Sequence, residues 1–191
     1  MARFHIEQHA QFLFYDTVQV VEPMNSAGFA LGLSATGRLT HRLEVRFNPQ
    51  LMFVERNIFY NLKYADPIDG NSIIKKVESV IFSFPFQTKF NSDRIGNFRV
   101  YMLGGVKADI DLAANARARR AEYLVKLEKI DYGVELGLGF NFYFPSFIFS
   151  PEIKVSNGLK NIHSRDESLK YSNVIDRIQS RMFVFSIHLE G

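Results

Sequence analysis

The chain has no cysteine and no tryptophan among its 191 residues. The absence of cysteine excludes disulfides, a thiolate nucleophile and cysteine-based metal sites. The chain also lacks a large excess of either charge, because its formal net charge is only +3. Its Lys and Arg residues are spread along the chain. This distribution argues against nucleic acid as a partner. No run approaches the ~18 consecutive apolar residues that a membrane helix needs, which excludes helical spanning of a membrane.

The sequence also lacks marks of targeting and of internal division. Its first residues, MARFHIEQHAQF, have no basic start, apolar run or small-residue cleavage site of the kind found in a secretory signal. We therefore expect either a cytosolic protein or a chain that begins after processing or truncation. No repeat with a period of about 20 to 50 residues and no low-complexity linker is present, so one domain over residues 1–191 is expected.

What the chain does have is aromatic and apolar residues in alternation with polar ones. It contains 19 Phe and 8 Tyr, a load typical of β structure. The alternating segments predict about eight strands. These strands are expected near residues 2–8, 26–36, 41–56, 74–89, 97–110, 130–143, 147–157 and 180–190.

The connections between the predicted strands are short and long by turns. TGRLT, FNSDRIGN and FPS are compact, whereas the others are longer and polar, as in NLKYADPIDGNS at residues 61–72. Short connections at one end and long ones at the other are typical of an up-and-down outer-membrane barrel. The predicted fold class is therefore all-β, an antiparallel up-and-down transmembrane β-barrel of about eight strands.

Each predicted strand has an apolar face and a polar face. In HRLEVRFNPQLMF, Leu43, Val45 and Phe47 alternate with Glu44 and Arg46. A soluble sandwich buries such an apolar face, whereas a membrane barrel turns it toward lipid. Strands near the ~9 to 11 residues that a tilted membrane strand needs favour the barrel. Aromatic residues also gather near predicted strand ends, as interfacial girdles require; these are Phe59, Tyr60, Phe90, Phe98, Phe142, Phe144 and Phe147.

The barrel hypothesis assigns a place to each face. We expect ionic and amide side chains to satisfy one another inside a barrel just wide enough for side chains, as a packed plug and not a conduction path. The apolar side chains are expected to contact outer-membrane lipid. The predicted interior residues are Glu44, Arg46, Asn48, Arg99, Lys107, Asp109, Glu135, Asn141, Glu152, Lys154 and His188, and the predicted lipid-facing residues are Phe47, Leu51, Leu138, Phe140, Phe183 and Phe185.

Three prolines conflict with a closed barrel. Pro49, Pro85 and Pro151 lie inside predicted strands, and a closed barrel offers no edge for a residue without a backbone donor. We therefore expect a β-bulge at each proline, or strand ends displaced by a few residues.

No pattern in the chain predicts catalysis, and we expect no enzyme activity, metal, cofactor or small-molecule substrate. The five histidines lack the helical spacing with Glu that zinc hydrolases use. HSRD at residues 163–166 has no nucleophile elbow, so a solvated loop is the favoured interpretation. The basic segment ANARARRAEY at residues 114–123 is either a patch for acidic lipopolysaccharide or a partner protein, or a loop kept soluble by its charge.

Several blocks carry a resemblance to a known family. They are LEVRFNPQLMFVER, KKVESVIFSFPFQTKF followed by NFRVYMLGGVKADIDLA, DYGVELGLGFNFYFPSFIFSPEIKVSNGLKN, and YSNVIDRIQSRMFVFSIHLEG. From about residue 26 onward the chain resembles the PorT family, outer-membrane barrels of Bacteroidota associated with type IX secretion and gliding motility. The resemblance implies a cell outer-membrane location, a non-catalytic role in export of cargo proteins, and other secretion-system proteins as partners. It also implies a signal peptide and a first strand that runs upstream of Met1, so the first strand is expected to be truncated.

Two other functions remain open from the sequence. A soluble ligand-binding barrel of the lipocalin kind would bury the apolar face around a cavity and expose the charged face. An outer-membrane enzyme acting on lipid or protein would depend on His163, Ser164 or Asp166.

Overall fold

The structure, a computed structural model, describes residues 2–8, 18–24, 26–66, 70–113, 128–162 and 175–191. These residues form one sheet whose paired strands are all antiparallel. Within these ranges no helix is long and apolar enough to cross a membrane. The strands are β1 (Ala2–Gln8), β2 (Val18–Met24), β3 (Gly28–Gly32), β4 (Ala35–Arg38), β5 (Leu43–Phe47), β6 (Gln50–Asp66), β7 (Gly70–Asn91), β8 (Phe98–Asp111), β9 (Ile130–Tyr143), β10 (Ile148–Gly158) and β11 (Ile175–Glu190).

Several of these strands are continuous parts of longer ones. β3 pairs with β6 and β4 pairs with β5 in one continuous register. β5 and β6 both pair with β7, again in one continuous register. β2 pairs with β6 one residue out of step with β3, because Met24 lies opposite Asn57 and Gly28 lies opposite Val54. If β2 to β4 and β5 to β6 are each counted as one strand, the described residues follow the predicted plan of about eight long antiparallel strands.

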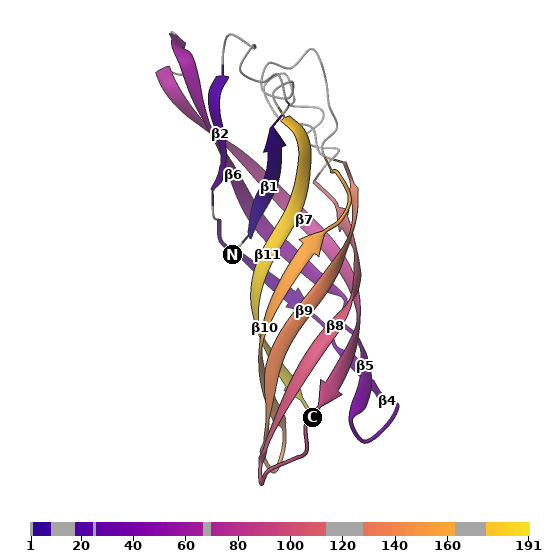
Figure 1. The fold of residues 1–191 in the computed structure, drawn as a ribbon. Coiled ribbons are helices and arrows are strands. Elements are labelled where there is room, and N and C mark those ends of the chain that lie inside the picture. The colour runs from indigo at the N-terminus through magenta and orange to yellow at the C-terminus, as the bar shows by residue number, and fades with distance from the viewer. Residues whose placement is uncertain (1, 9–17, 25, 67–69, 114–127, 163–174) are drawn as a thin grey trace.

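The sheet curls into an elongated cylinder (Figure 1). Its order runs from β1 through β11, β10, β9, β8 and β7 to β5, while β6 pairs with β7, β2 and β3. The two ends of the sheet meet where Ala2 forms a bridge with Ser26. The short turns between β4 and β5, β7 and β8, and β9 and β10 lie at the same end as the C-terminus.

The bulges expected at the prolines are wrong, because no register shift occurs at any of the three, but the alternative of a displaced strand end holds at Pro49. Pro49 lies between β5 and β6, and the register with β7 is the same on both sides of it. Pro85 lies in β7 near this break, where its carbonyl accepts a hydrogen bond of 3.2 Å from the N–H of Asn48. Pro151 stays in register opposite Ile187. Pro49 faces Leu33 and Pro85 faces Asn48, so both prolines lie beside the short interruption between β5 and β6.

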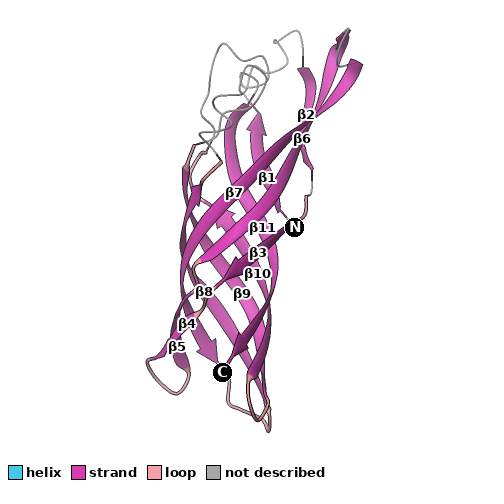
Figure 2. Ribbon diagram, turned by 180° about the vertical axis from the view of Figure 1, so that it is seen from behind, coloured by secondary structure: helices cyan, strands magenta, loops and turns pink. Residues whose placement is uncertain are grey.

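Two predicted connections are also wrong. Residues 18–24 form β2, and within residues 61–72 β6 continues to Asp66 and β7 begins at Gly70. The upper ends of β2, β6 and β7 project beyond the other strands (Figures 1 and 2). Asn, Asp, Pro and Gly in this region indicate a loop locally, but pairing between the two long strands overrides those preferences. The predicted strand over residues 130–143, by contrast, is confirmed by β9.

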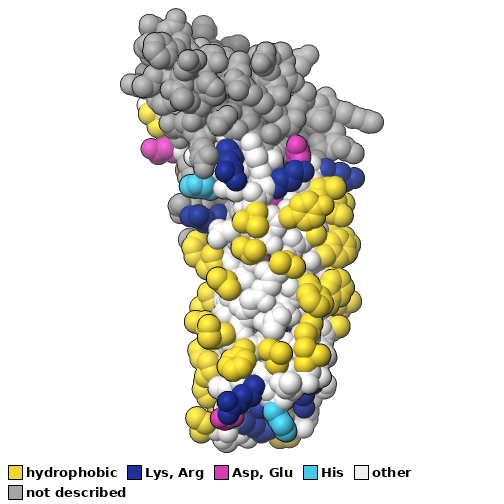
Figure 3. Space-filling view, turned by 45° about the vertical axis from the view of Figure 1, so that its right-hand side comes forward, with side chains coloured by type: hydrophobic (Ala, Val, Ile, Leu, Met, Phe, Trp, Pro, Cys, Tyr) yellow, Lys and Arg dark blue, Asp and Glu magenta, His cyan; other side chains and the backbone are white. Residues whose placement is uncertain are grey.

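The apolar face lies on the outside of the cylinder, as the space-filling view shows (Figure 3). Leu138 is 54% exposed and Phe185 is 67% exposed, on two different strands. Phe47, Phe140 and Phe183 are exposed too, and Leu51 is half-buried. This arrangement is the opposite of what a soluble lipocalin-like barrel requires, because apolar side chains surround the molecule instead of lining its centre.

The aromatic girdle is best developed at the short-turn end. There the rings of Phe98 and Phe140 stack at 5.6 Å between centroids, and Phe144 stacks on Phe147 at 4.8 Å. Phe90 and Phe142 are exposed as well. Phe59 is half-buried, and the Tyr60 side chain lies outside the described residues.

Candidate functional site

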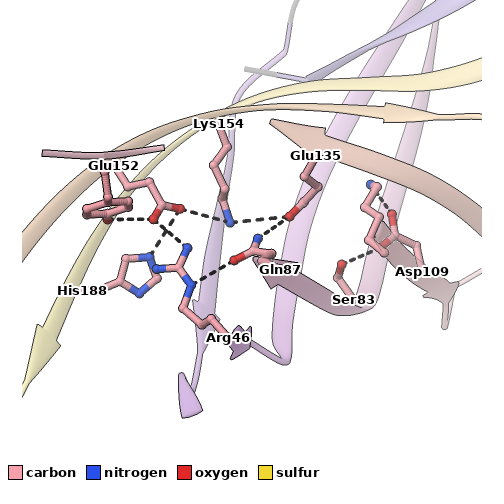
Figure 4. Close-up of polar contacts among 10 residues, drawn as sticks. Arg46, Ser83, Gln87, Asp109, Glu135, Glu152, Lys154 and His188 are labelled. Carbon is pink, nitrogen blue, oxygen red and sulfur yellow. Dashed lines mark hydrogen bonds and ion pairs between the residues drawn. The ribbon is translucent and has the colours of Figure 1, made fainter. Parts of the chain in front are cut away.

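Arg46 of β5 lies inside the barrel and is completely buried. Its Nε donates a hydrogen bond to Gln87 Oε1 of β7 at 2.9 Å, and its Nη2 donates to Glu152 Oε2 of β10 at 2.6 Å. In the sheet, β7, β8 and β9 stand between β5 and β10. The Arg46–Glu152 ion pair therefore crosses the lumen instead of following the wall (Figure 4). At this level the lumen is only as wide as two facing side chains.

Other groups converge on the Glu152 carboxylate. The Tyr101 hydroxyl of β8 donates to Oε2 at 2.9 Å, and Lys154 Nζ lies 3.7 Å from Oε1. His188 Nε2 of β11 lies 3.8 Å from the same Oε1. A carboxylate removed from water costs several kcal/mol unless cations and hydrogen bonds surround it. These neighbours provide that compensation.

The network continues to β9. Gln87 Nε2 donates to Glu135 Oε2, and Lys154 Nζ lies 4.0 Å from that oxygen. Arg46 and Lys154 thus balance the two carboxylates of Glu135 and Glu152. We call this set the central network; it comprises Arg46, Gln87, Tyr101, Glu135, Glu152, Lys154 and His188.

Two smaller ion-pair groups flank the central network. Lys89 Nζ lies 3.7 Å from Glu44 Oε2 and 4.0 Å from the centre of the Tyr101 ring. On the other side, Lys107 pairs with Asp109. In both groups a buried cation and a buried carboxylate occur together, which is the arrangement that a low-dielectric interior favours.

The structure places the sequence-predicted interior residues as follows. Arg46, Glu135, Glu152, Lys154 and His188 come together in the central network, while Glu44 and the pair of Lys107 and Asp109 belong to the flanking groups. The Asn141 Oδ1 accepts a hydrogen bond from Ser150, Asn48 is buried, and Arg99 is half-buried; none of these three joins the central network in the described residues.

Sequence reasoning missed Gln87, Lys89 and Tyr101. Their signal is the same alternation, because in SFPFQTKFN the residues between the phenylalanines include Gln87 and Lys89. Tyr101 lies two residues after Arg99 in β8 and therefore on the same, polar face of the strand. An aromatic residue at that position gives no local sign that it faces inward. Its position depends on Gly139, which lies directly opposite on β9. A Cβ at Gly139 would overlap the Tyr101 ring.

The interior is not polar throughout. Ala2, Met52, Val54, Ile81 and Met182 form a buried apolar cluster. Met182 and Ile81 precede His188 and Gln87 on the same strands, so this cluster lies farther from the short turns than the central network. The interior therefore combines an apolar layer with a neutralised ionic layer.

The contacts of this arrangement are ion pairs and hydrogen bonds among side chains of the chain itself. Among the described residues, no group of three or more His, Asp or Glu could hold a metal ion. His163, Ser164, Asp166 and the basic segment at residues 114–123 lie outside the described residues. The central network joins six strands by side-chain contacts, which fixes the curvature of the wall and occupies the lumen.

The comparison with known families agrees with this geometry. A family model described as outer membrane protein beta-barrel domain matches residues 3–164. No curated protein and no solved structure matches the chain. The matched region contains most of the antiparallel sheet, the apolar outer face and most of the central network. The chain therefore belongs to the outer membrane protein beta-barrel domain family and is a barrel protein of the outer membrane.

Proposed function

We propose that this barrel is a non-catalytic component of the type IX secretion system, a member of the PorT family that takes part in export of cargo proteins across the outer membrane of Bacteroidota, with gliding motility as a related output. The sequence blocks at residues 43–56, 75–90, 97–113, 131–161 and 171–191 support the proposal by their resemblance to that family. Membership in the outer-membrane barrel family supports the location.

One observation carries the mechanistic part of the proposal, namely the Arg46–Glu152 pair across the lumen. A polypeptide cargo cannot pass through a barrel whose opposite walls are joined by side chains. The contribution to export is therefore made by the surfaces of the barrel, as a docking or assembly component, with other secretion-system proteins as partners.

The short turns offer an ordered charged surface for such contacts. Arg42 Nη2 lies 2.9 Å from Asp93 Oδ2 across two neighbouring turns. Arg94 stacks over the Tyr143 ring at 4.0 Å. The opposite end of the barrel, where β8 ends at Asp111 and β9 begins at Ile130, is the second candidate surface.

The proposal is tested in the host cell. The gene is deleted, and cargo proteins are measured in the medium and in the cell fraction, with and without the wild-type gene restored. We expect cargo to accumulate in cells of the deletion strain and to return to the medium on restoration. In parallel, the barrel is purified from gently solubilised outer membranes, and we expect secretion-system proteins to accompany it. Normal export in the deletion strain would overturn the secretion role.

A matched pair of variants locates the contact surface. One variant changes Arg42 and Asp93 to Ala, and the other changes Arg117, Arg119 and Arg120 to Ala. Both are compared at equal levels of folded barrel in the outer membrane. Loss of co-purification in only one variant assigns the contact to the residues changed in that variant.

A further inference from the structure

The outer face of β11 changes from apolar to basic partway along the strand. Phe185 and Phe183 face outward on the short-turn side and are 67% and 49% exposed. Beyond Phe183, the outward positions are Arg181, Gln179 and Arg177, which are half-buried and alternate with buried residues. A strand of a membrane barrel makes this change where hydrocarbon gives way to lipid headgroups.

This change lies at the level of the outer leaflet. The short turns of an outer-membrane barrel are periplasmic, and Arg177 and Arg181 lie toward the opposite end of β11. Tyr132 of β9 is 56% exposed at this level, and its carbonyl accepts a hydrogen bond from the N–H of Leu159, the residue that follows β10. Exposed tyrosines are typical of the membrane interface. Lys and Arg side chains lie directly beyond the apolar band at this end (Figure 3).

The two arginines lean toward the same strand edge. Arg181 Nε donates to Asn157 Oδ1 at 3.0 Å, and Arg177 Nη2 donates to the Leu159 carbonyl at 3.4 Å. Gln179 Nε2 donates to that carbonyl at 3.0 Å. The arginines are four residues apart, about 14 Å along β11, but they reach for residues only two apart, about 7 Å. Their guanidinium groups therefore lie closer together than their backbone positions, with the Gln179 amide between them.

This basic group lacks a matching anion. Among the described side chains, no carboxylate forms an ion pair with Arg177 or Arg181, and Arg177 Nε is buried without a hydrogen-bond partner. Two lysines toward the same end do have such a partner, namely Lys76 with Glu55 and Lys160 with Glu128.

The register with β1 leaves this excess of positive charge in place. Arg3 is the cross-strand partner of Arg181, and Glu7 is the partner of Arg177. The four positions therefore comprise three arginines and one glutamate, a net charge of +2. Like charges at directly opposite positions destabilise a strand pair, so an anion beside Arg3 and Arg181 would stabilise this part of the wall.

An anion at this place must be compatible with the apolar wall. Leu159 is 57% exposed and Phe183 is 49% exposed beside the arginines. An acidic, water-soluble partner would have to lose its hydration at the edge of the hydrocarbon, which is costly for charged groups. A lipid instead places its acyl chains against Phe183 and its headgroup beside the arginines. Phosphate suits two such groups, because each guanidinium can donate two parallel hydrogen bonds to its oxygens.

We propose that Arg177, Gln179 and Arg181 form a binding site for the phosphate group of an outer-leaflet lipid on the outer wall of the barrel. The two guanidinium groups bind the phosphate oxygens, and the acyl chains lie along Phe183 and the apolar band. The proposal rests on the outer-membrane location and does not depend on the secretion role.

Native mass spectrometry of the full barrel in detergent tests this site. The probes are lipid A and the same lipid A after enzymatic removal of its phosphates, so that the acyl chains are identical. The wild-type barrel is compared with a double variant, Arg177→Gln with Arg181→Gln. The matched control is Lys76→Gln with Lys160→Gln, which removes the same charge from the same end of the barrel. Far-ultraviolet circular dichroism confirms that each variant is folded.

We expect the wild-type barrel to bind phosphorylated lipid A at least about tenfold more tightly than the dephosphorylated form. The arginine variant should lose this preference, and the lysine control should keep it. If the double variant does not fold, Arg177→Gln and Arg181→Gln are measured singly, and each should lower the preference by at least about threefold.

Four results would overturn the proposal. Equal binding of the two lipids would show that only the acyl chains are recognised. Equal loss in the arginine variant and the lysine control would show an effect of net charge and not of a site. Displacement of lipid A by inorganic phosphate at the same concentration would make free phosphate the ligand. Unchanged lipid binding by the arginine variant, with loss of a co-purified acidic protein, would make the surface a protein contact.

Discussion

The buried guanidinium of Arg46 is the residue on which the interior depends most. It is fully enclosed, and its two hydrogen bonds join β5 to β7 and to β10. Removal of one partner from a buried ion pair leaves the other charge without compensation, which costs more than the pair contributed. The exposed pair of Arg42 and Asp93 is similar in distance but is surrounded by water, so its contribution is small.

We therefore expect Arg46→Met to lower the free energy of unfolding by about 3 to 5 kcal/mol. Arg42→Ala, the matched exposed change, should lower it by less than about 1 kcal/mol. Urea titration of the barrel in lipid vesicles, followed by far-ultraviolet circular dichroism, measures both values.

A double variant separates charge from volume. Arg46→Met combined with Glu152→Met replaces the ion pair by apolar side chains of similar size and should recover at least half of the loss, because no uncompensated carboxylate remains. If the single Arg46 variant were no less stable than the Arg42 variant, the central network would not be what holds the interior together.

Single residues also mark the limit of what the sequence predicts. Alternation along HRLEVRFNPQLMF and FIFSPEIKVS indicates that Arg46, Glu152 and Lys154 share a face. It does not indicate that Arg46 meets Glu152, because these residues are 106 positions apart and the pair forms only when the sheet curls. Tyr101 escaped prediction for the same reason, since its place depends on a glycine on the next strand.

At the scale of strands, prediction succeeds where each strand has one lipid face and one interior face. β9 is such a strand, with buried and exposed residues alternating along most of its length. Prediction fails at β2 and at the upper ends of β6 and β7. There Pro23 and the residues near Asp66 and Gly70 carry the local signals of a connection, but pairing with a neighbouring strand determines the structure.

The pairing of β8 with β9 shows how one glycine positions an element. Gly139 lies opposite Tyr101, and the absence of a side chain lets the ring lie against the β9 backbone and reach Glu152. Gly139→Ala should lower the free energy of unfolding by about 1 to 3 kcal/mol, because the added methyl group overlaps the ring in a packed interior. Urea titration under the same conditions measures this loss.

Gly37→Ala is the matched control for this prediction. It lies in β4, and a Cβ there would be 4.0 Å from the nearest heavy atom, the Val45 carbonyl oxygen. Its effect should be within about 0.5 kcal/mol, as for other surface substitutions without a special contact. Equal losses in the two variants would show that the cost comes from glycine removal in general and not from the Tyr101 ring.

At the scale of the whole molecule, the barrel inverts the usual distribution of side chains. Apolar residues surround it, and charged residues fill a layer of its interior. This inversion suits a molecule surrounded by lipid, and it has a consequence for transport. A conduction path needs continuous water, whereas here Arg46, Tyr101 and Glu152 meet across the lumen.

We therefore expect the wild-type barrel to show no sustained open level in planar bilayers. Arg46→Ala combined with Tyr101→Ala removes two large buried side chains from the lumen at the level of the Arg46–Glu152 pair. This change should raise the fraction of time that the barrel conducts by at least about tenfold. The control, Leu138→Ala with Phe140→Ala, removes apolar volume from the lipid-facing wall and should leave conductance at the wild-type level. A sustained, ion-selective current through the wild-type barrel would contradict the plugged interior. Equal conductance in the two double variants would contradict it as well. Either result would place the ion path somewhere other than the level of the Arg46–Glu152 pair.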